Sequence, residues 1–172
     1  MNKEYTMNHQ NIFNEWTNYV NSKMKGQVLA VDLNFKKFIY LKDGEMERKE
    51  ILTKDNARQN VVHFLNVLNK KVYGNASKRF NKKVFVVPVI EGGTQNKQLH
   101  LHMTVVVPER FERDDFITLI SDTWTKTNFG NSVMKIQDVY NLNGRHNYMF
   151  KRKTKDEDIQ SAVVVECLNL PK

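Results

Sequence analysis

The fold is decided by one apolar stretch: Leu99-His100-Leu101-His102-Met103-Thr104-Val105-Val106-Val107. Side chains alternate between the two faces of a β-strand, so the odd-numbered residues of this stretch share one face and are all apolar. His100 and His102 share the opposite face. The pattern predicts a strand that packs against helices on one side and presents two imidazoles on the other.

The residues before this stretch predict its hairpin partner. Residues 84–91 form a second apolar run, and the polar segment 92–98 between the two runs contains Gly92-Gly93. Such a pattern is typical of a β-hairpin. If the hairpin pairs Glu91 with His100, then Glu91, His100 and His102 lie on the same face of adjacent strands.

The rest of the chain predicts an α+β fold with a central antiparallel β-sheet of about five strands and helices packed mainly on one face. We expect a single domain over residues 1–172, with a core over about 28–153 and a C-terminal tail over 154–172, in which residues 159–168 favour a strand. The further expected strands are 28–33, 35–41 and 133–140, and the expected helices are 8–24, 55–72 (N-capped near Asp55), 112–126 and 145–153.

Composition restricts the function classes. The chain has 27 Lys+Arg against 19 Asp+Glu, a net charge of +8, which favours an anionic partner such as nucleic acid. A single cysteine, Cys167, allows no internal disulfide and indicates a reducing compartment. No apolar run approaches the roughly 20 residues of a membrane span, and no signal peptide is visible. We therefore expect a cytoplasmic protein without membrane contact.

Glu91, His100 and His102 are the candidate metal ligands. One carboxylate and two imidazoles with open coordination positions suit Mg²⁺ or Mn²⁺ bound to a substrate phosphate, and they also allow Zn²⁺. An ordinary pair of strand histidines next to a polar strand end is the alternative for the same residues.

The third candidate element is the basic segment 144–153, with the sequence GRHNYMFKRK. On a helix, Tyr148 and Lys151 would share a face. A phenol has a pKa of about 10 and is a weak nucleophile at neutral pH. A neighbouring cation and a metal-polarised phosphodiester are what Tyr148 would need to attack phosphorus.

In this order, the histidine–hydrophobe–histidine stretch 100–102 and the Tyr148–Lys151 motif resemble the HUH endonuclease superfamily. Glu91 stands where small replication initiators of that superfamily have their third metal ligand, and residues 29–36 match the initiators' first motif loosely. The resemblance implies an RRM/ferredoxin-like sheet and a nuclease that nicks single-stranded DNA at an origin. It also implies that Tyr148 keeps the 5′ phosphate as a covalent link and that Lys151 assists catalysis.

The same resemblance implies a single-tyrosine initiator from a plasmid or phage, because the nearest preceding tyrosine, Tyr140, falls on a predicted strand. The chain after Lys153 is too short for a helicase domain, so the expected partners are origin DNA and a host helicase and polymerase. A single-tyrosine transposase or relaxase, and a non-catalytic nucleic-acid-binding module, remain alternatives. His102-Met103-Thr104-Val105 also fits the H-x-T-x motif of two-histidine phosphoesterases. Those enzymes need a second such motif, and this chain does not contain one.

Overall fold

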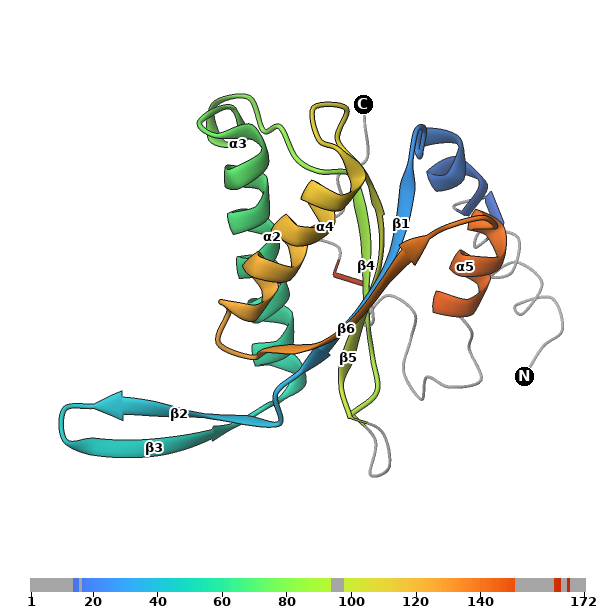
Figure 1. Cartoon of the computed structure of the whole chain (residues 1–172). Helices are drawn as coiled ribbons and strands as arrows, with labels where there is room; N and C mark the ends of the chain where they lie inside the picture. The colour runs from blue at the N-terminus through green and yellow to red at the C-terminus, as the bar shows by residue number, and fades with distance from the viewer. Residues whose placement is uncertain (1–13, 16, 94–97, 151–162, 165–166, 168–172) are drawn as a thin grey trace, which may run out of the picture.

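A computed structural model of the chain describes residues 14–15, 17–93, 98–150, 163–164 and 167. Its centre is a four-stranded antiparallel sheet in the order β4-β5-β1-β6 (Figure 1). The strands are β1 (Val28–Phe35), β4 (Val86–Glu91), β5 (His100–Val106) and β6 (Gly130–Asp138). The predicted α+β class and antiparallel sheet are therefore confirmed.

The sheet has four strands and not about five, because the chain leaves it after Phe35. The following residues form a separate two-stranded hairpin, β2 (Phe38–Asp43) and β3 (Met46–Ile51). Gly44 in the turn has a φ of 62°, a left-handed conformation that glycine adopts without strain. Figure 1 shows this hairpin extending away from the central sheet.

Helices α2 (Lys54–Tyr73) and α4 (Arg113–Thr125) cover one face of the sheet (Figure 1). The short helix α3 (Ala76–Arg79) follows α2. Helix α2 begins one residue earlier than predicted. Its N-cap is Thr53 and not Asp55, because Thr53 and Asn56 cap it reciprocally and Asp55 lies inside the first turn. Against these helices lies the apolar face predicted for 99–107, and its members are buried in the main core: Leu99, Leu101, Met103, Val105 and Val107.

The opposite face of the sheet carries helix α5 (Leu142–Met149) and the helical residues 17–23. A second, smaller apolar cluster joins them to the sheet; it includes Val20, Met24, Val87, Val89 and Met149. Helix α5 starts three residues before the predicted Arg145, because the Asn141 side chain accepts a hydrogen bond from the Gly144 amide and caps it. It ends at Met149, earlier than the predicted Lys153.

Some predictions fall on residues that the structure does not describe. Lys151 lies outside the described residues, as does most of the predicted tail strand 159–168, of which Val163 forms one antiparallel bridge with Val89. Among the described residues, no helix combines the length and apolarity that crossing a membrane requires.

Candidate active site

Three adjacent strands bring the candidate ligands together. Glu91 at the end of β4 pairs with His100 at the start of β5, which confirms the predicted hairpin register. On the other side of β5, His102 pairs with Asp32 in the middle of β1. The face opposite the main core therefore carries Glu91, His100, His102 and Asp32 within two rungs of the sheet.

The Glu91 carboxylate lies between the two imidazoles. Its Oε2 is 3.2 Å from His102 Nε2 and 3.9 Å from His100 Nε2. The two rings stand edge to face, with centroids 4.6 Å apart. Glu91 and His102 are buried, with 8% and 6% of their surface exposed, and His100 is partly exposed. Glu91 and His102 thus form the buried part of the site, and the imidazole of His100 is its more accessible part.

Hydrogen bonds at the far side of each ring determine which nitrogen is available. His102 Nδ1 lies 2.6 Å from Asp32 Oδ1, and His100 Nδ1 lies 3.0 Å from the Gln98 carbonyl oxygen. A carboxylate and a carbonyl only accept, so each Nδ1 carries the proton. Nε2 of each ring faces Glu91, and a ring with its proton on Nδ1 is the tautomer that offers Nε2 to a metal.

The buried His102 Nε2 makes no hydrogen bond with any described residue, in spite of its closeness to Glu91. A buried polar atom without a partner is costly, and a buried carboxylate needs a compensating positive charge. One ligand atom from each of Glu91, His100 and His102 lies within 4.8 Å of the others. A metal ion between them would satisfy both requirements, so this group can bind a metal ion.

Asp32 is the residue of the site that the sequence analysis did not single out. It bridges His102 to Arg145 on α5, whose guanidinium donates to both Asp32 oxygens and to the Met103 carbonyl oxygen. Burial favours the neutral acid, but the hydrogen bonds from His102 and Arg145 outweigh it and lower the pKa of Asp32 from 3.8 to about 2. Asp32 is therefore ionised when it orients His102. Its only sequence signal is a charge inside the apolar strand Val28–Phe35.

Side-chain contacts attach helix α5 to the sheet at Asp32 and Thr104 and to the helical residues 17–23 at Asn21. Arg145 bonds Asp32, the Thr104 hydroxyl of β5 donates to Met149 Sδ at 3.2 Å, and His146 Nδ1 lies 2.7 Å from Asn21 Oδ1. His146 is buried, and burial followed by the nearby charge of Arg145 lowers its pKa from 6.5 to about 4. His146 is thus a neutral, buried residue that packs α5 against the helical residues 17–23.

The attachment of α5 places Tyr148 beside the candidate ligands. Tyr148 lies one helical turn after Arg145, and its ring meets His102 edge to face with centroids 5.9 Å apart. About half of its surface is exposed, 52%. The structure thus brings Tyr148 to His102, whereas the helical pairing of Tyr148 with Lys151 stays a prediction because Lys151 lies outside the described residues.

The fold and this group define an α+β protein with a candidate Glu/His/His metal centre and an exposed tyrosine at its rim. No protein-family model matches the chain, and no curated protein or solved structure is significantly similar to it.

Proposed function

We propose that this protein is a metal-dependent endonuclease and strand transferase that cleaves single-stranded DNA with Tyr148 as the nucleophile. One observation carries the proposal: a solvent-exposed phenol on α5 lies against His102, one of three residues able to bind a metal ion. A phenol at the rim of a metal centre is positioned to meet a phosphodiester bound there.

The proposed reaction transfers a phosphoryl group from DNA to the protein. The Tyr148 oxygen forms a bond to phosphorus while the bond from phosphorus to the 3′ oxygen breaks. The phenol proton passes to solvent, and the departing 3′ oxygen takes a proton from water. A bound divalent ion would polarise a non-bridging phosphate oxygen and lower the charge that opposes attack.

The ligand types favour Mn²⁺ over Mg²⁺. Mg²⁺ prefers oxygen ligands and retains water, whereas two imidazoles beside one carboxylate suit softer divalent ions. Three protein ligands leave coordination positions for phosphate oxygens. Lys151, at the end of the tyrosine motif, is proposed to contact the same phosphate and to stabilise its charge in the transition state.

Formation of a covalent adduct tests the proposal directly. The purified protein is incubated with Mn²⁺ and a pool of random-sequence single-stranded DNA that carries a fluorophore at the 3′ end, and the products are run on a denaturing gel. A labelled band at the size of the protein plus a fragment of DNA is expected, and EDTA should abolish it. The same pool annealed into duplexes should give far less adduct.

Two tyrosine variants locate the nucleophile. Tyr148→Phe should give no adduct. Tyr140→Phe should match the wild type, because Tyr140 is 95% exposed and follows the end of β6 at Asp138, outside α5 and the candidate ligand group. An adduct that survives in Tyr148→Phe would refute the assigned nucleophile. A wild-type protein that binds Mn²⁺ and DNA but never forms an adduct would be a binding module and not an endonuclease.

A further inference from the structure

The β2–β3 hairpin is an exposed arm. Among the described residues it pairs with no other strand, and isolated two-stranded hairpins are only marginally stable in water. Burial of its two aromatic side chains would stabilise the arm, yet both are exposed, Phe38 by 40% and Tyr40 by 56%. Large apolar groups gathered on an exposed arm are typical of an interaction surface.

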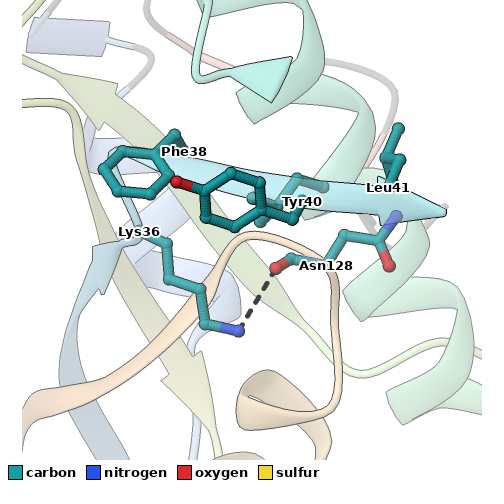
Figure 2. A pocket seen from close by; sticks show the side chains of 6 residues that line it. Lys36, Phe38, Tyr40, Leu41 and Asn128 are labelled. Atoms are coloured by element: carbon teal, nitrogen blue, oxygen red, sulfur yellow. Dashed lines mark hydrogen bonds between the residues drawn. The ribbon is translucent and has the colours of Figure 1, made fainter. Parts of the chain in front are cut away.

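The two rings lie on the same face of the arm and have lysines beside them. Tyr40 pairs with Lys49 across the hairpin, and the Lys49 ammonium lies 4.1 Å from the centroid of the Phe38 ring. The two rings meet edge to face at 5.6 Å. Lys36 approaches the same place and donates to the Asn128 carbonyl oxygen at 3.3 Å (Figure 2). An open pocket of about 370 Å³ at this place is lined by Lys36, Phe38, Tyr40 and Asn128, together with Ile39 and Leu41 (Figure 2).

Charge is distributed unevenly along the arm. The half nearest the sheet, residues 36–40 and 49–51, carries three lysines against one glutamate, a net charge of +2. The half around the turn, residues 41–48, carries two cations against three carboxylates, a net charge of −1. An anionic ligand would therefore be attracted to the base of the arm and repelled from its tip. Both aromatic rings lie in the positive half.

The base of the arm begins at the metal end of the sheet. Asn34 of β1 pairs directly with His100, and β2 starts at Phe38, shortly after β1 ends. A strand of DNA held at the candidate metal centre could continue along this end of the sheet to the arm. The arm and the candidate active site would then bind successive parts of one ligand.

We propose that the Phe38–Tyr40 face of the arm binds single-stranded DNA next to the cleavage site. Bases stack on the two rings, and Lys36 and Lys49 contact the phosphates. Aromatic rings flanked by cations are the usual means of binding unpaired nucleotides, whose faces are open to stacking, whereas a duplex hides them. The inference rests on the proposed function and extends it by naming a surface that binds the DNA at the same end of the sheet as His100.

Binding without cleavage tests the arm separately from the nuclease. Fluorescence anisotropy with a labelled random-sequence single-stranded DNA, in EDTA, measures affinity for wild type and for Tyr40→Ala. Loss of one base–aromatic stack should weaken binding about 5- to 100-fold. Tyr40→Phe keeps the stacking surface and should restore affinity. Met46→Ala is the matched control, since Met46 is a 75% exposed apolar residue of the arm outside its positive half.

Each result decides the proposal. Affinity of Tyr40→Ala equal to wild type, with the variant folded by circular dichroism, would overturn it. A wild-type dimer that Tyr40→Ala converts to a monomer in light scattering would instead assign the face to a second copy of the chain. Tighter binding of RNA than of DNA of the same sequence would also overturn it. If the proposed nuclease activity is absent, the Mn²⁺-dependent adduct does not form in the gel assay. The affinities measured here in EDTA do not depend on that activity.

Discussion

Replacing Asp32 by asparagine should weaken metal binding although Asp32 is not itself a proposed ligand. The substitution keeps the shape of the side chain and one oxygen that can accept from His102 Nδ1, but it removes the charge between His102 and Arg145. A carboxylate behind a ligating histidine fixes the ring and raises its basicity, and loss of such a partner costs about 10- to 100-fold in metal affinity. We therefore expect Asp32→Asn to bind Mn²⁺ about 10- to 100-fold more weakly than the wild type in isothermal titration calorimetry.

The same variant should be less stable without metal. The pKa of Asp32 falls from 3.8 to about 2 in the folded protein, and at 1.36 kcal/mol per pKa unit this corresponds to about 2 kcal/mol in favour of the ionised residue. Asparagine also leaves the guanidinium of Arg145, only 12% exposed, without an anionic partner. Urea unfolding at neutral pH in EDTA should therefore show a loss of about 2 kcal/mol.

Asp138→Asn is the matched control. Asp138 on β6 is also bonded to an arginine, with its Oδ1 3.0 Å from Arg113 Nε, and the hydrogen bond from Arg113 is the main cause of its lowered pKa. Asp138 contacts neither histidine, so its replacement should leave Mn²⁺ affinity unchanged. If Asp32→Asn binds Mn²⁺ as tightly as Asp138→Asn does, Asp32 has no role in orienting His102.

Three further predictions concern the site and its surroundings. Glu91→Gln should lower Mn²⁺ affinity more than it lowers the unfolding free energy, because it removes charge without opening a cavity; unchanged affinity in calorimetry would exclude Glu91 as a ligand. His102→Ala should eliminate adduct formation but reduce DNA affinity only slightly, because phosphate contacts of lysines and arginines dominate binding, and equal losses of both would indicate a structural role. The neutral, buried His146 should make the protein acid-sensitive: its pKa is about 4 when folded and 6.5 when unfolded, so the unfolded state takes up the proton first as pH falls. Stability should fall from about pH 6.5 toward pH 4 by up to about 3 kcal/mol, and urea unfolding of His146→Gln should show a smaller decrease over that range.

Local patterns in the sequence predicted the parts of the site that lie close together along the chain. The alternation at 99–107 identified the apolar face of β5, and the loop length placed Glu91 opposite His100, because both depend on neighbouring residues. The signal in the sequence for the β2–β3 arm was weaker. Its second strand, Met46–Ile51, is mostly charged and exposed, so it has no apolar alternation that would distinguish it from a loop.

Long-range pairing explains what the sequence could not predict. Asp32 meets His102 only because β1 lies beside β5, and no local pattern states which strands are neighbours or in what register. The bond from Arg145 to Asp32 likewise depends on where α5 lies on the sheet. The number of strands in the sheet was wrong for a related reason: the continuation of β1 has strand-like residues, but their partner is β3 and not the sheet.

The central position of β1 also affects how the protein is made. Of the four strands in the described sheet, β1 is synthesised first, yet its neighbours are β5 and β6, which end at Val106 and Asp138. At about 5–20 residues per second, roughly 4–14 s pass between completion of β1 and completion of β5. During that time β1 has two unpaired edges and an apolar face, which are hazards for aggregation. Folding therefore depends on contacts between distant residues and should be slow for a chain of this length, and Tyr148 reaches its position only after the last strand of the sheet is complete.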